Sequence, residues 1–301
     1  MSGRLTAPPG TTLALGLARG RETWTRTSGG ADPCQVFAIG SVTKTFVAAA
    51  TLRLRDRGLL NLDAPLAEYL PQWARGVAAN GATVRHALCH RSGIPEHVDR
   101  AFVGQLTGDP TRSWTPREVL ALVVPPSSPA PASYGYSNSN YLLLGLLIEQ
   151  VTGLSLGEVL ERELIGPLNL EGVSYPTGNG PSLPSRAVST AAGAAGGMVA
   201  TAHALARWGR LLYGGHVLTE GSLAEMVDVR DGGYGLGVMR LRIGHRVGIG
   251  HVGEIVGFSS LLAAFPDEDL ALAVLADAEG VDVLAIAAAA LERDEIAERP
   301  A

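Results

Sequence analysis

The stretch from Val36 to Gly58 reads V-F-A-I-G-S-V-T-K-T-F-V-A-A-A-T-L-R-L-R-D-R-G. Its apolar pattern predicts a short extended approach over residues 36–40, then a helix over 42–57 that Gly58 ends. Ser41 lies at the start of this helix, three residues before Lys44. Residues three apart lie on the same helix face, so the spacing places a hydroxyl and an amine one turn apart.

The basic residues of the chain are almost all arginine. There are 23 arginines and a single lysine, Lys44. Arginine stays protonated in proteins, whereas a buried lysine can lose its proton and act as a base. A lysine that persists in such a composition is expected where arginine cannot serve, which makes Lys44 the first candidate for a catalytic group.

Ser41 and Lys44 together suggest nucleophilic catalysis. A serine hydroxyl is a weak nucleophile until a base takes its proton, and a desolvated neutral lysine is such a base. The positive end of the helix dipole favours the negative charge that develops there. The alternative is a helix-capping serine with a solvated lysine, because the S-x-x-K pattern alone is common.

Two further short motifs carry groups that suit such a site. Tyr136-Ser137-Asn138 follows a Pro/Ser-rich loop, where a phenol could shuttle a proton and an amide could hold a carbonyl or the lysine. His251-Val252-Gly253 precedes a predicted strand, and its glycine would let a substrate backbone approach closely. The backbone N–H of Glu254 could pair with that of Ser41 as an oxyanion hole. Taken singly, each motif is also compatible with an ordinary turn.

S-V-T-K, Y-S-N and H-V-G, in this order, resemble the three motifs of the serine β-lactamase and penicillin-binding protein superfamily. The Y-x-N form is similar to class C enzymes and soluble DD-carboxypeptidases, and segments such as H-R-S-G-I-P and A-G-G-M-V-A-T-A extend the likeness over nearly the whole chain. The resemblance implies that Ser41 is the acylated nucleophile, with Lys44 as its base. It makes Tyr136 the proton shuttle and Asn138 a ligand of substrate and lysine, and it places His251 and Gly253 on the strand that flanks the substrate.

The third motif departs from the form with lysine, threonine and glycine that many members carry. His251 is expected to be mostly neutral near pH 7, and the Val252 side chain offers no hydrogen bond. The usual grip on a substrate carboxylate is therefore weakened. Arg240 and Arg242 could replace it, although solvated strand arginines are the expected interpretation.

The fold class predicted is α/β (α+β): a β-lactamase-like, central antiparallel sheet flanked by helices, with an inserted all-α lobe. Residues 1–60 and 185–301 would form the sheet domain, and residues 61–184 the helical lobe. An initial hairpin turns at Arg19-Gly20-Arg21, and strand patterns return at 234–241, 258–265 and 270–276. Helices are expected at the ranges 84–90, 116–123, 141–151, 156–164, 202–213 and 281–295, with a shorter one after Thr219.

Composition narrows the function classes. Hydrophobic residues make up 46% of the 301, and the net charge is −5, so a folded protein without an electrostatic footprint for nucleic acid or an anionic membrane is expected. No apolar run reaches the length of a membrane span, and no secretory signal is visible, which predicts a cytoplasmic protein. Because few residues precede the first strand, either a homodimer partner or the closing helix alone would cover that face of the sheet, so both monomer and homodimer are expected possibilities.

Two other motifs are interpreted as decoys. Gly153-Leu154-Ser155-Leu156-Gly157 matches the G-x-S-x-G nucleophile elbow, but a helix precedes it and Ser155 suits a capping box. A histidine and cysteine cluster has possible metal spacing but lacks the H-E-x-x-H glutamate; it comprises His86, Cys89, His90 and His97. We therefore expect no metal and no organic cofactor.

The sequence thus predicts a serine hydrolase that forms an acyl-enzyme on Ser41 with an ester or amide from a small molecule or short peptide. Esterase or amidase activity is favoured over an activity on cell-wall peptides. The alternatives are an acyltransferase of the same fold, a non-catalytic penicillin-binding-like sensor, and a metal-dependent hydrolase that uses the His86 cluster. The natural substrate is not specified by these residues.

Overall fold

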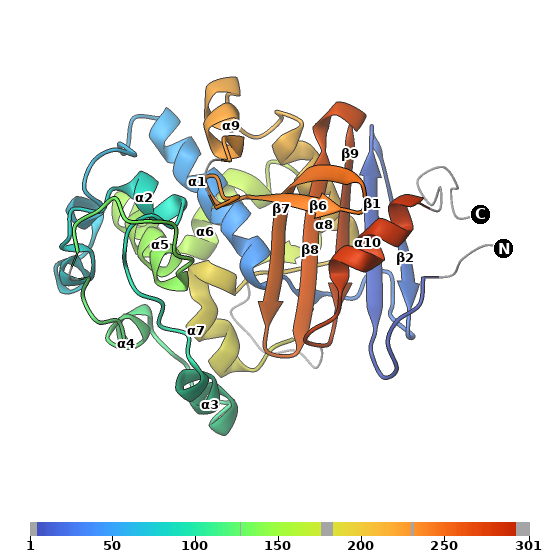
Figure 1. The fold of residues 1–301 in the computed structure, drawn as a ribbon, viewed down its shortest axis with the longest axis horizontal. Helices are drawn as coiled ribbons and strands as arrows, with labels where there is room; N and C mark the ends of the chain where they lie inside the picture. Colours follow the sequence, from blue (N-terminus) through green and yellow to red (C-terminus); the bar gives the residue numbers. More distant parts are fainter. Residues whose placement is uncertain (1–4, 127, 176–182, 230–231, 293–301) are drawn as a thin grey trace.

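The computed structural model describes residues 5–126, 128–175, 183–229 and 232–292. Its main feature is a six-stranded antiparallel sheet in the order β2-β1-β9-β8-β7-β6 (Figure 1). The strands are β1 (Leu13–Arg19), β2 (Glu22–Ser28), β6 (Met239–Ile243), β7 (Arg246–Ile255), β8 (Phe258–Phe265) and β9 (Leu270–Ala276). A second, three-stranded sheet in the order β3-β5-β4 comprises β3 (Phe37–Ala38), β4 (Val173–Ser174) and β5 (Val199–Ala200).

The central strands of the sheet are buried on both faces, because helices cover each face. Every residue of β8 and of β9 is buried, as expected for central strands. Helix α8 (Ala202–Tyr213) packs against β1, β8 and β9 on one face. Helix α10 (Val283–Glu292) crosses the other face and covers a core that includes Leu13, Leu15 and Leu17 (Figure 1).

The remaining helices gather on one side of the sheet (Figure 1). They are α1 (Thr43–Asp56), α2 (Val84–Leu88), α3 (Arg100–Gly108), α4 (Pro116–Leu120), α5 (Asn138–Thr152), α6 (Leu156–Leu160), α7 (Arg186–Gly196) and α9 (Glu220–Val227). Short 3₁₀ turns occur at Gly40–Val42, Leu66–Tyr69, Gln72–Ala78 and Pro266–Glu268, and a π turn, Glu161–Ile165, continues α6. The predicted antiparallel sheet and the mixed architecture are confirmed.

Several predicted boundaries are wrong. The strand expected over 234–241 begins only at Met239, because Gly237 has a φ of +78° and breaks the extended run. The helix expected over 84–90 ends at Leu88, since His90 has a φ of +56°; His86 and His90 therefore do not share a helix face. The initial hairpin and the strands over 258–265 and 270–276 are confirmed. Residues 293–295 of the closing helix lie outside the described residues.

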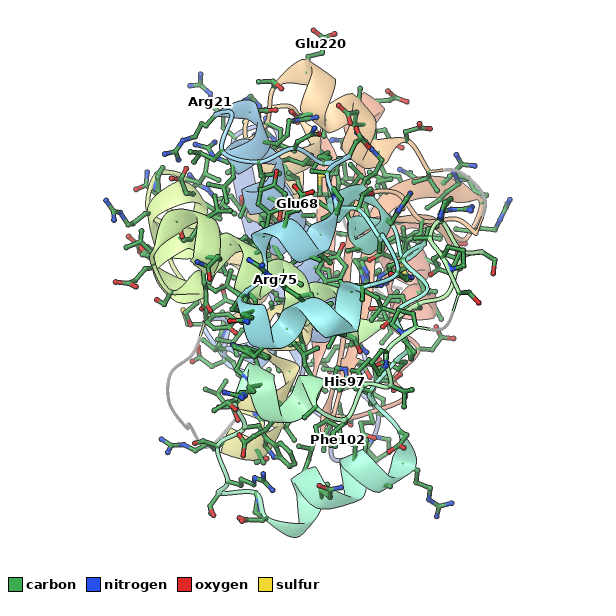
Figure 2. The ribbon with its side chains drawn as sticks, turned by 90° about the vertical axis from the view of Figure 1, so that its left-hand side faces the viewer. Arg21, Glu68, Arg75, His97, Phe102 and Glu220 are labelled. Carbon is green, nitrogen blue, oxygen red and sulfur yellow. The ribbon has the colours of Figure 1, made fainter. Side chains whose placement is uncertain are left out.

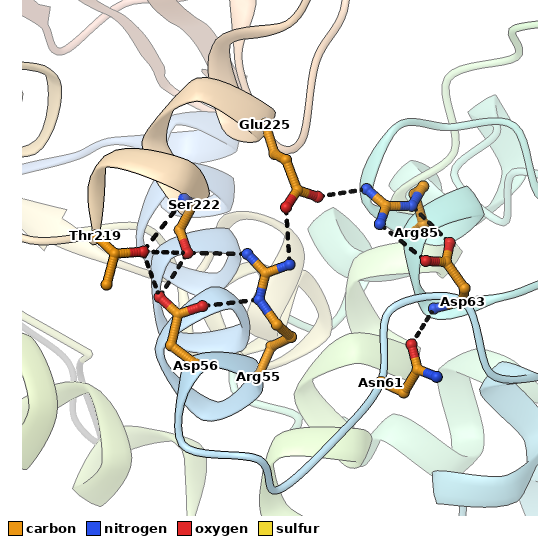
Figure 3. A network of polar contacts seen from close by, with 8 residues as sticks. All are labelled: Arg55, Asp56, Asn61, Asp63, Arg85, Thr219, Ser222 and Glu225. Atoms are coloured by element: carbon orange, nitrogen blue, oxygen red, sulfur yellow. Dashed lines mark hydrogen bonds and ion pairs between the residues drawn. The ribbon is translucent and has the colours of Figure 1, made fainter.

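Helix α1 joins the sheet to the helical side and is held at both ends. Near its start, Phe46 stacks on Trp208 of α8 with ring centroids 4.0 Å apart, and the indole N–H of Trp208 donates to Thr45 Oγ1 (2.9 Å). Near its end, Arg55 binds Glu225 of α9, whose other oxygen accepts from Arg85 of α2 (Figure 3). These contacts fix the position of the helix whose first turn carries Lys44.

The network drawn in Figure 3 continues on both sides of Glu225. Asp56 accepts from Thr219 and Ser222 at the start of α9, and the guanidinium of Arg85 pairs with Asp63. Arg85 holds the pKa of Asp63 below its usual range by a direct hydrogen bond. The network therefore ties α1, α2 and α9 together at the end of α1 that is remote from Ser41.

Among the described residues, no single helix is long and apolar enough to cross a membrane; α5 with the following segment to Ile165 meets the criterion only as a pair bent by 78°.

Candidate active site

Ser41 lies in the 3₁₀ turn Gly40–Val42 that leads into α1, where this turn packs directly on β7. A Cβ atom placed on Gly253 would lie 2.2 Å from the carbonyl oxygen of Ile39 and 3.1 Å from the backbone nitrogen of Ser41. Gly40 has a φ of +47°, and a Cβ there would lie 3.0 Å from the backbone nitrogen of Glu254. Only glycine at both positions lets the two backbones approach this closely.

The side chain of Lys44 is fully buried and points to three oxygen atoms. Its Nζ lies 2.9 Å from Ser41 Oγ, 2.7 Å from Asn138 Oδ1 and 2.7 Å from the backbone oxygen of Ala195. Ala195 belongs to the last turn of α7, where helix carbonyl groups have no partner within the helix. Three segments far apart in the sequence therefore converge on one amine.

Burial lowers the pKa of Lys44 from its ordinary value of 10.5 to about 7, and the carboxylate of Glu96 partly opposes this effect. Near neutral pH the amine is therefore populated in its uncharged form. Two of its three partners, Asn138 Oδ1 and Ala195 O, are acceptors only and take the two N–H groups of a neutral amine. The lone pair then faces the hydroxyl of Ser41, which is the direction required of a base for this serine.

Tyr136 reaches the same hydroxyl from the other side. Its phenol oxygen lies 2.8 Å from Ser41 Oγ, and the Lys44 Nζ lies 5.0 Å from the centre of its ring. Burial raises the pKa of Tyr136, so the phenol keeps its proton across the physiological range. The Ser41 oxygen thus lies between an amine and a phenol, an arrangement that can take up a proton on one side and return one on the other.

His251 is buried in β7, and its ring does not belong to the residues that line the cavity beside Ser41. Its Nδ1 faces the carbonyl oxygen of Val252, and its Nε2 lies 2.8 Å from the phenol oxygen of Tyr234. Because a carbonyl only accepts, Nδ1 donates, and Nε2 accepts from Tyr234. Burial, with the nearby Lys44, lowers the pKa of His251 to about 3, so this histidine is neutral at physiological pH. Both ring nitrogens of His251 are thus engaged within the protein, and a contact of this residue with substrate stays a prediction.

A cavity of about 590 Å³ opens beside Ser41, within the range that holds a small ligand. Its wall is mostly apolar and comes from α3, α7 and the end of β7, including Val98, Phe102, Val103, Leu106, Val188, Ala191, Ile255 and Val256. Figure 2 places Phe102 on α3, with His97 above it on the preceding loop. The acidic side chains that line the cavity are Glu254 and Glu279, and no lysine or arginine is among its described lining residues.

Arg240 and Arg242 do not line this cavity; both are exposed on β6, and Arg240 donates to the backbone oxygen of Val229. Among the described residues, no three His, Cys, Asp or Glu side chains come together as a group that could hold a metal ion. In the G-x-S-x-G segment, Gly153 ends α5 with a φ of +70° and Ser155 forms a capping box with Glu158. The capping interpretation of that segment is confirmed.

The site also contains three groups that the sequence did not single out. They are the Ala195 carbonyl, the phenol of Tyr234 and the carboxylate of Glu96, which accepts from Asn138. Glu96 directly follows the H-R-S-G-I-P segment, so its place beside a family-like motif was the only sequence signal for it. Ala195 begins the A-G-G-M-V-A-T-A segment, but nothing in that segment indicates the contact of its carbonyl with Lys44, and Tyr234 has no local signature.

Comparison with known protein families identifies the family of this chain. A family model described as Beta-lactamase matches residues 7–295. The chain belongs to the beta-lactamase family. The expected likeness to serine β-lactamases and penicillin-binding proteins is thereby confirmed, and with it the expected fold.

The structure of this chain is similar to that of a D-stereospecific amidohydrolase from Streptomyces sp. The TM-score is 0.79 and the sequence identity 30%, and the match covers 89% of each chain. The D-amino acid amidase of Ochrobactrum anthropi has a TM-score of 0.80 and 25% identity over 95% of this chain and 93% of its own. Esterase EstB of Burkholderia gladioli is 34% identical over 152 residues, 46% of this chain and 38% of the esterase. The chain thus covers well under half of that relative's length.

Proposed function

We propose that this protein is a serine hydrolase that cleaves esters or amides through an acyl-enzyme on Ser41. The observation that carries the proposal is the position of Ser41 Oγ between Lys44 Nζ (2.9 Å) and the phenol oxygen of Tyr136 (2.8 Å). The remaining Lys44 partners are acceptors, so the lone pair of the neutral amine is available only to the serine. This role needs a base that can lose its proton, as the single lysine of the chain can.

In the acylation step, Ser41 transfers its proton to Lys44 as its oxygen bonds to the substrate carbonyl carbon. The backbone N–H groups of Ser41 and Glu254, brought together by Gly40 and Gly253, stabilise the carbonyl oxygen as it becomes negative. The carbon–oxygen or carbon–nitrogen bond to the leaving group then breaks, and the leaving group receives the proton from Lys44 through Tyr136. Water repeats the sequence on the acyl-enzyme, releasing the acid and restoring Ser41.

The cavity favours acyl groups that are apolar and carry no carboxylate. Its wall is mostly aliphatic and aromatic, its charged lining groups are acids, and His251 is neutral where many relatives have a lysine. An anionic substrate would be desolvated there without a counter-charge, which costs binding free energy. One similar protein is named a D-stereospecific amidohydrolase and another a D-amino acid amidase, which makes amides of apolar D-amino acids the first compounds to test.

The test compares wild type, Ser41→Ala and the exposed-serine control Ser113→Ala on p-nitrophenyl valerate and on D- and L-phenylalanine amide, each with and without a chelator. We expect turnover by wild type and Ser113→Ala, and mass spectrometry of the quenched reaction should show the acyl group on Ser41. Equal activity in Ser41→Ala would overturn the proposal. Loss of wild-type activity on adding the chelator would favour a metal-dependent hydrolase instead.

A second comparison tests the substrate class. The monoester of glutaric acid with p-nitrophenol has the length of the valerate ester but ends in a carboxylate. We expect kcat/KM for the glutarate ester to be at least ~10-fold lower, because like charges across a binding site are unfavourable. Equal kcat/KM for both esters would remove the proposed discrimination, while leaving the role of Ser41 intact.

A further inference from the structure

Glu96 lies on the loop between α2 and α3 and accepts four N–H groups with its two carboxylate oxygens. Oε1 accepts from the backbone nitrogens of His97 (2.8 Å) and Val98 (2.9 Å). Oε2 accepts from the backbone nitrogen and from the side-chain Nδ2 of Asn138, both at 2.8 Å. All four partners are donors, and the two oxygens of a carboxylate can accept all four bonds.

Two of these bonds lie at the N-terminus of α5, where backbone N–H groups have no partner within the helix. Helix α5 begins at Asn138, and the residue in the capping position, Ser137, makes no side-chain capping bond. Glu96 takes that place from a different segment of the chain. Its negative charge also suits the positive end of the helix dipole.

The contact with Nδ2 decides which way the Asn138 amide points. A carboxylate only accepts, so the NH₂ group must face Glu96 and the oxygen must face the opposite side. On that side, Oδ1 lies 2.7 Å from Lys44 Nζ. With the amide reversed, its NH₂ group would face Lys44 and would compete with Ser41 for the lone pair of the neutral amine.

We propose that Glu96 is a positioning residue that orients the Asn138 amide and thereby directs the lone pair of Lys44 to Ser41. The inference rests on the proposed function, because it assigns Lys44 the role of base. It assigns Glu96 no contact with the substrate: its effect passes through Asn138. The negative charge of Glu96 also raises the pKa of Lys44 without direct contact.

The groups around Lys44 show why Glu96 matters electrostatically. Among the described residues, six titratable groups face Lys44. They are His251 of β7, His90 in the segment after α2, Glu96 and His97 of the loop before α3, Tyr136 in the turn before α5, and Tyr141 of α5. Burial lowers the pKa of His90 and His251 and raises that of Tyr136 and Tyr141, so these groups are neutral near pH 7. Of the surrounding groups, Glu96 is the one whose negative charge raises the pKa of Lys44.

The experiment uses the fact that Lys44 is the only lysine. Protein labelled with ¹³C at lysine Cε gives a single side-chain resonance, and its titration reports the pKa of Lys44 without any substrate. The variants are Glu96→Gln, which removes the charge, and Glu96→Asp, which keeps the charge on a shorter side chain. The matched control is Asp99→Asn, three residues away, whose side chain only caps α3 at Phe102 and whose replacement also caps well.

We expect Glu96→Gln to lower the pKa of Lys44 by roughly one unit, because the negative charge is lost. We expect kcat to fall by about 10-fold or more, because a catalytic group that is held in the wrong orientation reacts much more slowly. The ascending limb of the kcat/KM pH profile should move to lower pH by the same amount. Glu96→Asp should keep the wild-type pKa but lose kcat, and Asp99→Asn should change neither. In an Asn138→Leu background, Glu96→Gln should cause little further loss of kcat.

The inference is overturned if Glu96→Gln leaves the Lys44 titration at its wild-type position, or if Glu96→Asp retains the full kcat. Independent, multiplicative losses in Glu96→Gln and Asn138→Leu would also contradict it, since they would indicate a general structural role. If Ser41→Ala proves as active as wild type, the proposed function fails, but the titration of Lys44 still decides whether Glu96 controls that amine. If Glu96→Gln does not fold, Glu96→Asp and Asn138→Leu carry the test.

Discussion

The phenol of Tyr234 donates a hydrogen bond to Nε2 of His251, with the two atoms 2.8 Å apart in the buried centre of the site. This bond holds the histidine in its neutral form, because Nδ1 is already occupied as a donor to the Val252 carbonyl. The third motif of this chain therefore supplies a neutral hydrogen-bonded pair where many relatives place a cation. Protonation of that pair has a cost that appears in the stability of the whole protein.

Acid should destabilise the protein between pH 6.5 and about 3. The folded-state pKa is about 3 for His251 and about 2 for His90, both below the ordinary 6.5, so the unfolded chain binds more protons in this window. As the pH is lowered through this window, the free energy of unfolding should decrease by up to ~1.4 kcal/mol per pH unit for each histidine. Urea unfolding at several pH values measures this slope.

The variant that isolates one of these histidines is His251→Phe. It should show a shallower pH dependence than wild type, although the unpaired Tyr234 hydroxyl costs about 1–3 kcal/mol at pH 7. The exposed His245→Gln variant is the control and should follow wild type. An unchanged slope in His251→Phe would show that His251 does not titrate as its burial implies.

Alkaline conditions should stabilise wild type relative to Lys44→Met. The folded-state pKa of Lys44 is about 7 against an ordinary 10.5, so between these values the unfolded chain binds the extra proton. The unfolding free energy of wild type should rise through this window by on the order of 5 kcal/mol relative to the variant, whose methionine side chain does not titrate. Parallel unfolding curves of both proteins from pH 7 to pH 10 check this; a constant difference would contradict the lowered pKa.

Lys44→Arg should abolish most of the activity without removing the positive charge. A guanidinium cannot lose its proton in this pH range and so cannot accept the proton of Ser41. We expect kcat/KM on p-nitrophenyl valerate to fall by about 10³-fold or more. Wild-type kcat/KM should rise with pH through about 7, as the neutral form of Lys44 becomes populated. Activity of Lys44→Arg within 10-fold of wild type would exclude Lys44 as the base.

Gly253→Ala should separate the turn that carries Ser41 from β7. The added methyl group would meet the Ile39 oxygen at 2.2 Å, which is possible only if the two segments move apart. We expect a loss of about 1–3 kcal/mol in unfolding free energy and of ~100-fold in kcat/KM. Gly221→Ala is the control: its Cβ would have no neighbour within 4 Å, and alanine in helix α9 should stabilise by about 0.5–1 kcal/mol. Full activity in Gly253→Ala would show that this close approach is dispensable.

The strands and helices with strong local patterns could be predicted from the sequence. The apolar runs over 258–265 and 270–276, joined by the turn over 266–269, have the strand bounds predicted for them. The helix over 202–213 begins after Thr201, whose hydroxyl accepts from the backbone nitrogen of Ala204. In these segments local propensity, capping and burial all favour the same structure.

Helix α7 was not predicted, because Gly193 and Gly196 interrupt the alanines of its second half, and Gly193 has a φ of +44°, outside the helical range. The helix forms through tertiary contact: a Cβ at Gly145 of α5 would lie 2.7 Å from Ala194 Cβ, so α5 and α7 pack with almost no side chain between them. This packing brings the Ala195 carbonyl to Lys44. A segment whose helix could not be predicted from local propensity thus helps to build the site.

The residues of the candidate site also divide into those that the sequence predicts and those that only the tertiary structure reveals. Ser41, Lys44, Tyr136 and Asn138 follow from the order and spacing of their motifs, and the structure brings their side chains together. Glu96 lies 42 positions from Asn138 and has no pattern of its own, so its link to the site exists only in three dimensions. The hydrogen bond between Tyr234 and His251 likewise could not be predicted, because neither residue's sequence surroundings indicate the other as its partner.

The sheet order places the first strand beside the last. Thr12 binds Asp277 across 265 positions of the chain, and β1 pairs along its length with β9. Such non-local pairing gives a high contact order, which slows folding. During synthesis, the apolar strand β1 must remain without its β9 neighbour until residues 270–276 have left the ribosome. The nucleophile is made early, but its supporting strand β7 is made late, so the site can assemble only at the end of translation.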